Sequence, residues 1–434
     1  MKKVLFLFST CLGSILVNAQ DTTLISKAEI LKIVIEQNID IKIAEQSFQL
    51  SKANYRQTNG IFVPSISLSY SGMETTNPLM AFGSKLNQEI LATSDFNPSL
   101  LNDPEKTRNF ETRIEFQQPI LNMDGVYKRK AAKANMEASL LQVDRQSDYI
   151  LFEVEKAYMQ LQLAHCLVNV MQKVEKAALS NEQLSKNSFE QGLIQYSDLL
   201  AVSVRLTEVK NQLQQAKSNV QNASDYLAFL MNTEQRNILK PMDKLGLAKH
   251  SLKDPVLSED RADIQAMNLA SVSYSSLYKA EKMTLLPRLN VFGSYALYDD
   301  EIFKGDANGY MLVAQFSWSI LDGTQRIAKI QKSQAAYEKS KLEYDQYLAQ
   351  SNLELLRAKR MVGLASNKLI QGELALKQSG ESLKIRTDRF KEGLEKSSDL
   401  LLAESIYAHK ELGYYQTIFE YNFALAYLQF LTKE

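Results

Sequence analysis

Few residues of this chain have the types and spacing that catalysis requires. The three histidines, His165, His250 and His409, share no metal-ligand spacing, and Cys166 falls in an apolar helical stretch. The sequence contains no phosphate-binding loop, dinucleotide-binding glycine motif or hydrolase elbow. We therefore predict that the protein is not an enzyme, needs no cofactor and holds no metal.

Acidic residues that follow a glycine at fixed spacing are more informative, because they occur twice. The pattern Phe-x-x-Gly-Leu-x-x-x-Ser-Asp-Leu-Leu spans 189–200 and returns at 390–401, with seven identities in twelve positions. The same shift aligns 223–230 with 424–431, with five identities in eight positions. Chance predicts about one identity in each window, so the sequence indicates an internal duplication.

Each copy of the pattern predicts a turn between two helices. Glycine suits the left-handed residue after a helix end, which is the place of Gly192 and Gly393. Serine suits the N-cap of the returning helix, and aspartate is favoured at its positive end. The residues concerned are Ser197, Asp198, Ser398 and Asp399. Helix capping alone explains these side chains without any function.

Long helices must position these turns. No proline lies between Pro119 and Pro241 or after Pro287, and both windows are rich in good helix formers. Residues 125–190 and 324–391 are therefore predicted to form helices of about 100 Å each, at ~1.5 Å per residue. Such helices are too long for an ordinary globular core.

Apolar residues in the helix after Gly192 follow the 3.5-residue period of a coiled coil. They are Leu199, Val202, Leu206, Val209, Leu213, Ala216, Val220, Ala223, Leu227 and Leu230. In the last helix the corresponding set begins with Leu400, Ala403 and Tyr407 but then reaches Lys410 and Thr417. We expect that second seam to be partly wet.

Two stretches in each half alternate apolar and polar residues as strands do. They predict strands near 64–75, 110–121, 287–298 and 309–321, about the length of tilted membrane strands. Four aromatic residues occupy positions expected for an interfacial girdle: Tyr70, Tyr295, Tyr298 and Trp318. A soluble sheet with one buried face would show the same alternation, so the pattern alone leaves both structures open.

The N-terminus predicts export. Residues 1–19 have a basic start, an apolar run and a small-residue cleavage site at Val17-Asn18-Ala19, as in a secretory signal peptide. Cys166 would then be the single cysteine of the exported chain, which excludes an intrachain disulfide. The balance of 50 basic and 50 acidic residues gives no indication of a nucleic-acid partner.

Membrane insertion would require a barrel shared between copies. No later segment approaches the ~20 apolar residues of a spanning helix, and open sheet edges are not tolerated in lipid. Four strands cannot close a barrel, whereas three copies would supply twelve, above the ~8 of the smallest membrane barrels. A cyclic oligomer resolves the shortage of strands.

With these features the chain resembles the TolC-like outer-membrane efflux protein family. The resemblance covers nearly all of the predicted mature chain and rests on the duplicated Phe-x-x-Gly-x5-Asp-Leu-Leu pattern. It also rests on the strand exits 120–125 and 320–323, which lead into the long helices, and on the segment 77–104, which looks like a loop common in bacterial relatives. The order and duplication of these segments carry the resemblance together.

The resemblance implies a mainly α-helical protein with membrane β-structure. It would form a homotrimer with a twelve-stranded β-barrel, four strands from each subunit, that continues into a long coiled-coil α-barrel in the periplasm. The chain would comprise the signal peptide 1–19, a first repeat 20–231, an equatorial segment 232–262 and a second repeat 263–434. Each repeat would hold a helix, two barrel strands and a helical hairpin. Residues 76–109 and 299–308 would be surface loops.

The implied function is that of a passive exit duct in a tripartite efflux or type I secretion system. Outer-membrane lipid, a periplasmic adaptor (a membrane fusion protein) and an inner-membrane pump of RND or ABC type would be its partners. The candidate pore-entrance residues are Asp399, Asp198 and Glu395, and the candidate adaptor contacts are Gly192, Leu193, Gly393 and Leu394. Three copies of Asp399 around a narrow entrance would favour cations.

The chain departs from its relatives at the tips. Close relatives often carry an acid where this chain has Leu402, and some carry a base where it has Glu395. A latch built on those residues cannot be transferred unchanged. A periplasmic coiled-coil adaptor or structural protein is the alternative, although neither requires membrane-length strands before each hairpin. The sequence names no cargo and does not distinguish the pump classes.

Overall fold

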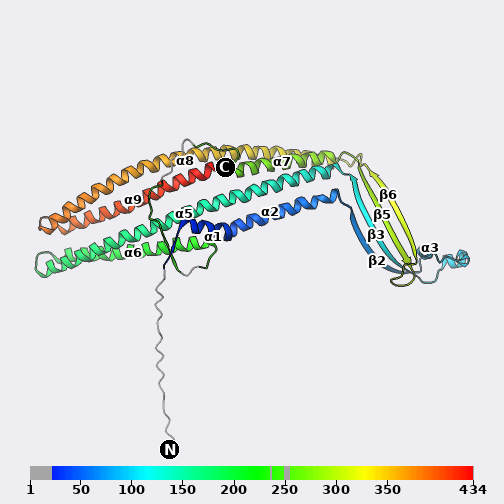
Figure 1. The fold of residues 1–434 in the computed structure, drawn as a ribbon, viewed down its shortest axis with the longest axis horizontal. Coiled ribbons are helices and arrows are strands. Elements are labelled where there is room, and N and C mark those ends of the chain that lie inside the picture. The colour runs from blue at the N-terminus through cyan, green and yellow to red at the C-terminus, as the bar shows by residue number, and fades with distance from the viewer. Residues whose placement is uncertain (1–21, 235–236, 249–254, 434) are drawn as a thin grey trace, which may run out of the picture. The chain divides into compact units, whose positions relative to one another are not determined.

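The computed structural model describes residues 22–234, 237–248 and 255–433. The predicted signal peptide and His250 lie outside these residues. The chain divides into two compact units. The longer elements are labelled in Figure 1. The elements are β1 (Thr22–Ile25), α1 (Lys27–Gln37), α2 (Ile39–Gln57), η1 (Thr58–Ile61), β2 (Ser65–Thr75), α3 (Pro78–Asn87), η2 (Thr93–Phe96), α4 (Pro98–Asn102), β3 (Thr107–Leu121), α5 (Met123–Glu190), α6 (Tyr196–Met231), β4 (Ile238–Pro241), α7 (Ala262–Met283), β5 (Arg288–Asp299), β6 (Ala307–Ser317), α8 (Gln325–Lys391) and α9 (Ser397–Thr432).

The unit formed by 43–145 and 259–351 is built on an antiparallel sheet of four strands. The strand order is β2-β3-β5-β6, so β2 and β6 are the edge strands. Ser65 of β2 faces Gln117 of β3, and Arg288 of β5 faces Ser317 of β6. All four predicted strands are found, but the last ends at Ser317.

The two faces of this sheet differ in chemistry. Directly opposed residues share a face, so the register separates an apolar set from a polar set. The apolar face carries exposed Ile66, Leu68, Tyr70, Ile114, Phe116, Tyr295, Tyr310 and Leu312. The polar face carries Ser67, Ser69, Ser71, Glu111, Arg113, Glu115 and Ser294. Neither face is buried against a second layer of apolar side chains, unlike a sheet in a soluble core.

One of the four predicted girdle residues, Tyr298, lies on the other face of the sheet. Tyr298 is opposite Glu111 and therefore belongs to the polar face, because its register places it one residue out of phase with Tyr295. Trp318 follows the end of β6, and its indole N–H donates to the Leu285 carbonyl at 3.0 Å. Tyr70 does lie on the apolar face, where its ring stacks on Phe303 with centroids 4.9 Å apart.

The segment between β2 and β3 folds into a small lobe of two helices, where the sequence predicted only a surface loop. Both helices begin with Asn-Pro. The Asn77 side chain accepts from the Leu79 N–H at 3.1 Å, and Asn97 accepts from Ser99 at 3.1 Å, while each proline fills the first helical position. Buried Gln88 joins the lobe to the sheet by donating to the Arg108 carbonyl at 2.8 Å.

A network of polar side chains joins helices of the unit formed by 43–145 and 259–351. Arg261, only 2% exposed, donates to Asp263 at 2.6 Å, and the Tyr347 hydroxyl donates to Asp263 at 2.6 Å. Burial acts to raise the pKa of Asp263, but the hydrogen bonds from Arg261 and Tyr347 outweigh it and hold the pKa below its usual value. Burial, together with Asp263, raises the pKa of Tyr347 to about 12.

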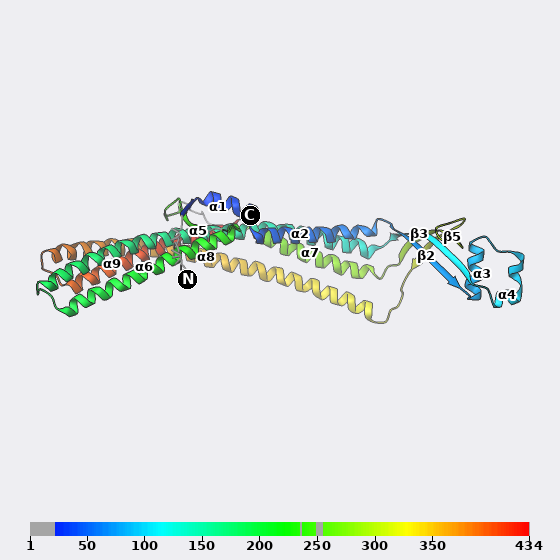
Figure 2. The same cartoon turned by 90° about the horizontal axis from the view of Figure 1, so that it is seen from below.

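The other unit, which includes 146–258 and 352–433, contains two helical hairpins, except for the first parts of α5 and α8, which belong to the unit of the sheet. The helices α5 and α8 have 68 and 67 residues, and α6 and α9 have 36 residues each. Figure 2 shows the four helices side by side. Absence of proline and glycine-rich breaks lets each helix run to its tip, as the sequence predicted.

The predicted seams agree with burial better in α6 than in α9. Eight of the ten predicted seam residues of α6 are buried, and Leu199 and Ala223 are half-buried. In α9 the buried positions begin with Leu400 and Ala403 as predicted but include Glu411 and Ile418, which contact α5 of the other hairpin, whereas Lys410 is exposed. Among the described residues, no helix has the length and apolar character needed to cross a membrane.

The largest apolar core of this unit surrounds the start of the chain. The short strand β1 pairs in parallel with β4, and Ile30 and Val34 of α1 are fully buried against α5 and α6. Ser26 and Glu29 form a capping box that starts α1. This core joins α1 to the two helices of the first hairpin, α5 and α6.

Candidate functional site

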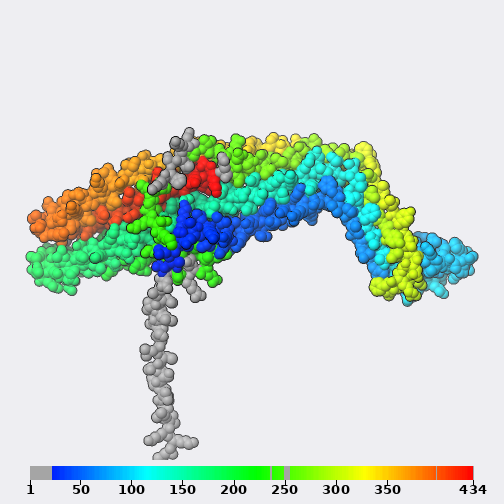
Figure 3. Space-filling model, in the orientation of Figure 1, coloured from blue at the N-terminus to red at the C-terminus, as the bar shows by residue number. Residues whose placement is uncertain are grey.

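The two hairpin turns have the same backbone structure. Gly192 and Gly393 both have φ +72°, in the left-handed region predicted for them. At the first turn the Gly192 N–H donates to the Phe189 carbonyl and the Leu193 N–H to the Ser188 carbonyl, each at 2.9 Å. The second turn repeats both bonds, so each long helix ends in a Schellman motif. Both turns lie at one end of their unit (Figure 3).

The two tip aspartates occupy different environments. Asp198 is exposed, and its carboxylate accepts the Gln195 backbone N–H at 3.2 Å, which caps α6. Asp399 is half-buried in the first turn of α9, where its own N–H donates to the Lys396 carbonyl at 3.1 Å. The predicted place of Asp198 at the helix start therefore accounts for its carboxylate. The predicted N-caps are wrong, because Gln195 caps α6 and Lys396 caps α9, so that Ser197 and Ser398 lie inside the first turns. No hydrogen bond or ion pair involves the Asp399 carboxylate among the described residues.

Glu395 is held by two arginines, which we call the arginine clamp (Arg386, Arg389 and Glu395). Arg386 Nη1 lies 2.7 Å from Glu395 Oε1, and Arg389 Nε lies 2.9 Å from Oε2. The Glu395 side chain is only 10% exposed, against 41% for Arg386 and 57% for Arg389. The second tip therefore exposes the guanidinium groups of Arg386 and Arg389 to solvent, whereas the Glu395 carboxylate is largely buried.

The clamp belongs to the second tip alone. The shift that aligns the repeats places Ser185, Ser188 and Ile194 at the corresponding positions of the first tip. Sequence analysis missed the two arginines, although their i, i+3 spacing in the last turns of α8 puts them on one helix face. The sequence could have predicted the clamp from this spacing of the two arginines, together with the acidic Glu395 two residues after Gly393.

The first tip presents apolar surface instead. Leu193 is 71% exposed, and the rings of Phe189 and Tyr196 pack across the turn with centroids 5.6 Å apart. At the second tip Leu394 is exposed to 68%, beside the clamp. The two tips therefore share a backbone but differ in the chemistry that they offer to a partner.

Polar contacts that the sequence did not reveal join the two hairpins. The Asn181 side-chain amide of α5 donates to both carboxylate oxygens of Glu404 on α9, at 2.8 and 2.9 Å. Lys173 of α5 forms an ion pair with Glu411 of α9 at 3.2 Å. Each of these contacts joins a residue of the first repeat to a residue of the second. The spacing of apolar residues within one helix could therefore not predict them.

The histidine and cysteine side chains considered for catalysis lie in surroundings that favour packing over reactivity. The His165 ring lies 3.0 Å from the Leu239 carbonyl, and burial lowers the pKa of this histidine. Burial also raises the pKa of the half-buried Cys166 thiol, which disfavours a reactive thiolate. Within the described ranges, no cluster of three or more His, Cys, Asp or Glu side chains could hold a metal ion.

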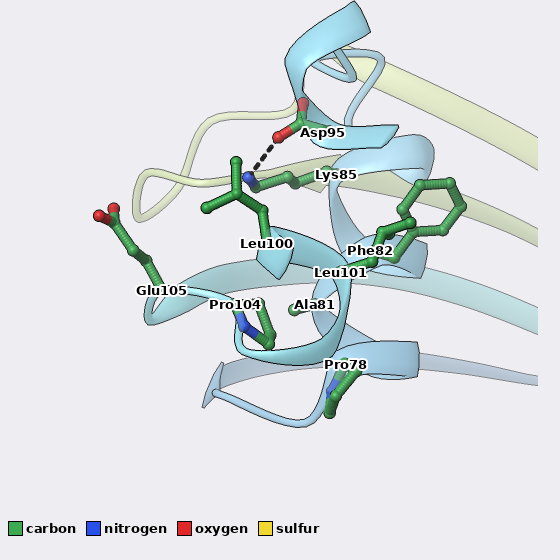
Figure 4. A pocket seen from close by; sticks show the side chains of 9 residues that line it. All are labelled: Pro78, Ala81, Phe82, Lys85, Asp95, Leu100, Leu101, Pro104 and Glu105. Atoms are coloured by element: carbon green, nitrogen blue, oxygen red, sulfur yellow. Dashed lines mark hydrogen bonds and ion pairs between the residues drawn. The ribbon is translucent and has the colours of Figure 1, made fainter. Parts of the chain in front are cut away.

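The lobe contains a cavity of about 240 Å³ (Figure 4). Prolines and apolar side chains line most of it, including Phe82, Leu100 and Leu101. The two charged groups that face each other there, Lys85 and Asp95, form an ion pair at 2.8 Å. Glu105 also lines the cavity, and no bond between it and Lys85 or Asp95 is drawn in Figure 4.

Solved structures share this fold. The channel CmeC of Campylobacter jejuni superposes with a TM-score of 0.80 at 14% identity, covering 94% of this chain and 85% of that one. A membrane protein of Pseudomonas aeruginosa gives 0.81 at 15% identity, with coverage of 94% and 93%. The outer membrane channel MtrE of Neisseria gonorrhoeae, in its open state, gives 0.78 at 17%, with coverage of 94% and 88%.

These identities are low, so the likeness to the solved structures establishes the fold. No curated protein sequence matches the chain. The sequence model of one family, described as outer membrane efflux protein, matches residues 30–233 and 256–414. Since that match spans most of the chain, this protein belongs to the outer membrane efflux protein family and is a protein of the outer membrane that extends into the periplasm.

Proposed function

We propose that the protein is the passive outer-membrane exit duct of a tripartite efflux or type I secretion system. Substrates would pass through it from an inner-membrane pump and adaptor, across the periplasm and the outer membrane. The observation that carries this proposal is the sheet with one exposed apolar face and one polar face. In a membrane barrel these faces meet lipid and the aqueous lumen, respectively.

The unpaired edges of the sheet support a trimer. Both β2 and β6 lack a neighbour on one side within the chain, and lipid does not tolerate such edges. Three copies joined edge to edge would give twelve strands. Family members generally form trimers and work with efflux pumps, which agrees with this arrangement.

The hairpins would continue the duct as a coiled-coil α-barrel in the periplasm. In this organisation the duplicated units are 20–231 and 263–434, the segment 232–262 forms an equatorial belt, and 1–19 is removed on export. The equal lengths of the paired helices support the duplication. Transport energy would come from the pump, of RND or ABC type, because the chain has no nucleotide-binding motif.

The tips would form the entrance and meet the adaptor. We assign adaptor contact to Gly192, Leu193, Gly393 and Leu394, whose turns are exposed. Asp399 is the leading entrance acid, since the Asp198 carboxylate caps its own helix and Glu395 is clamped. Three Asp399 carboxylates close together would repel one another and attract cations.

Membrane fractionation and conductance test the proposed duct. We expect a heat-labile trimer in outer membranes that forms pores in planar bilayers. A soluble monomer without pore activity would reject the duct and favour a periplasmic coiled-coil protein.

Substitution of the tip acids tests the entrance. Asp399→Ala should lower cation preference, measured as the reversal potential in a salt gradient, because it removes three charges from the narrowest region. Asp198→Ala is the matched control and should change cation preference less, since its carboxylate is engaged at the α6 N-terminus. Equal preference in wild type and Asp399→Ala would contradict the assignment of Asp399.

A further inference from the structure

The contact between the two hairpins changes character along its length. We call the contacts of α5 and its hairpin with α9 the inter-hairpin seam. Far from the tips the seam is apolar: Phe152 of α5 stacks on Phe430 of α9 with centroids 5.1 Å apart, and Leu163 packs with Ile418. Leu412 and Tyr415 complete an apolar cluster around Met171. This part of the seam excludes water and is held by apolar burial.

Nearer the tips the seam becomes polar. The contacts described there are Lys173 with Glu411 and Asn181 with Glu404. The apolar cluster at that level, formed by Ala178, Leu206 and Val209 with Val174, contains only first-hairpin residues. At this level the first hairpin is therefore closed by its own apolar contacts, whereas the contacts described between the two hairpins are polar. The hairpins can part at this end without exposing that apolar cluster.

Glu404 is the unusual member of this polar part. Its carboxylate is largely removed from water and faces a neutral amide, that of Asn181 from α5. From α6 it faces Arg205, which is itself paired with Glu208 at 3.3 Å. No other charged side chain of the described residues acts on it. Burial raises the pKa of Glu404 above the ordinary value, while Asn181 and Arg205 offset part of that effect.

Glu411 provides the contrast on the same helix. Its side chain is 10% exposed, but it faces the Lys173 ammonium, which is 70% exposed. The hydrogen bond that Lys173 donates to Glu411 raises the pKa of Lys173, so this lysine keeps its charge throughout the neutral range. The Lys173–Glu411 contact is therefore an ion pair with matched charges, whereas the Asn181–Glu404 contact buries a charge against a neutral partner.

We propose that Glu404 is a positioning residue that makes the closure of the tip end depend on protonation, so that acidification of the periplasm holds the second hairpin against the first and narrows the entrance. This proposal rests on the proposed duct. A protonated carboxyl keeps an acceptor oxygen for the Asn181 amide and no longer buries a charge. An ionised carboxylate is better hydrated when the hairpins part.

The direction of the effect follows from linkage. When the hairpins are together the pKa of Glu404 is raised, and when they part the carboxyl is exposed and returns toward its ordinary value. The closed arrangement then binds the proton more tightly. Closure is favoured at low pH and is lost as pH rises through the raised pKa. Each unit of difference between the two pKa values changes the ratio of closed to open tips by up to about tenfold.

Conductance of the full-length trimer in planar bilayers tests the proposal. Lowering the pH on the tip side from about 7.5 to about 5 should reduce the open fraction of wild type several-fold. Glu404→Gln is neutral at every pH and should give a low open fraction with little pH dependence. Glu411→Gln is the matched control, because it weakens the same seam and leaves the carboxyl group of Glu404 in place. It should raise the open fraction at both pH values and keep the pH response.

A distance measurement separates this proposal from the duct itself. Labels on Leu193→Cys and Leu394→Cys, in a Cys166→Ser background, should report tips that approach on acidification in detergent-solubilised protein. Glu404→Gln should abolish that approach. If the tips respond but no pore forms, the proposed duct fails and Glu404 keeps its assignment. A pH response that persists in Glu404→Gln, or wild-type tips that do not respond, overturns the proposal.

Discussion

The two tip acids of the second hairpin differ, because the Glu395 carboxylate is paired with two arginines and the Asp399 carboxylate has no partner among the described residues. Glu395 was expected at the entrance as an acid, but Arg386 and Arg389 enclose its carboxylate. Arg389 also reaches the Leu394 carbonyl at 3.4 Å, so one side chain braces both the turn and the acid. Loss of Glu395 would release two guanidinium groups that are already exposed on their outer sides.

We therefore predict that Glu395→Gln makes the entrance more cationic and its tip more mobile. Reversal potentials should show a weaker cation preference, and single-channel noise should rise. Stability should change by no more than about 1 kcal/mol, since the arginines are largely solvated. Glu392→Gln removes the same charge from an exposed residue outside the clamp. Identical shifts in the two variants would show that the clamp has no influence.

The buried Asp263 gives a prediction with a pH dependence. Removing one partner from a buried ionic network costs about 3 kcal/mol or more, so Asp263→Asn should markedly lower the unfolding temperature near neutral pH. The pKa of Asp263 is depressed in the fold, so its contribution is present above the ordinary aspartate range and is lost as pH falls through the depressed value. The difference in unfolding temperature between wild type and Asp263→Asn should therefore become smaller in strong acid.

Tyr347→Phe is the control for that network. It removes one hydrogen bond to Asp263 but leaves Arg261 paired, so it should cost about 1 kcal/mol with little change between neutral and mildly acidic pH. An Asp263→Asn variant as stable as wild type would contradict the assignment of the network as a structural support of this unit.

Partners of single charges were the hardest features to predict from the sequence. The positions of Asp198, Asp399 and Glu395 in the turns were predictable, because a glycine followed at fixed spacing by serine and aspartate has a local meaning. The clamp on Glu395 and the Asn181–Glu404 contact were not predicted. The first depends on which way a turn aims its side chains, and the second joins residues more than two hundred positions apart.

At the scale of elements, the periodic features were the predictable ones. The predicted helices 125–190 and 324–391 agree with α5 and α8 to within two residues at each end. The 3.5-residue period identified the α6 seam. The seam of α9 departed from its expected path because Glu411 and Ile418 take the buried side in place of Lys410. The helical lobe between β2 and β3 was missed, although Asn77-Pro78 and Asn97-Pro98 are helix-start signals.

The tip glycines allow a prediction about hairpin stability. A Cβ added at Gly192 or Gly393 would meet no atom within 4 Å, so only the left-handed backbone opposes a side chain there. Gly192→Ala and Gly393→Ala should each destabilise the protein by about 1 to 2 kcal/mol. Gly363→Ala, also in open space but inside α8, should instead stabilise it by roughly 0.5 to 1 kcal/mol.

Thermal unfolding of the three glycine variants under one set of conditions measures this difference in sign. The same chemical change is made three times, so changes in side-chain volume cancel in the comparison. Tip variants that are as stable as Gly363→Ala would mean that the turns relax into another conformation without strain.

At the scale of the whole molecule, the surfaces left exposed in one copy indicate where the other copies of the proposed trimer would bind. The sheet leaves β2 and β6 unpaired, and α8 carries leucines every eleven residues that no other element covers. Leu342, Leu353 and Leu364 are exposed to 68, 44 and 58%. Eleven residues are close to three full helical turns, so such residues lie on one stripe. Apolar stripes of this kind usually mark protein interfaces.

Substitution within the stripe tests assembly separately from folding. Leu364→Asp should leave the helical content of the chain nearly unchanged, because the side chain is 58% exposed within one copy, but should reduce the amount and heat resistance of the proposed trimer several-fold. A charge placed in an apolar interface loses its hydration without gaining a partner. Asn367→Asp introduces the same charge one turn away, at an exposed polar position, and should leave the trimer intact. Unheated gel electrophoresis of outer membranes distinguishes the two. A Leu364→Asp trimer as abundant and heat-resistant as wild type would show that α8 faces water in the assembly, and the interface would then have to be sought on the sheet edges alone.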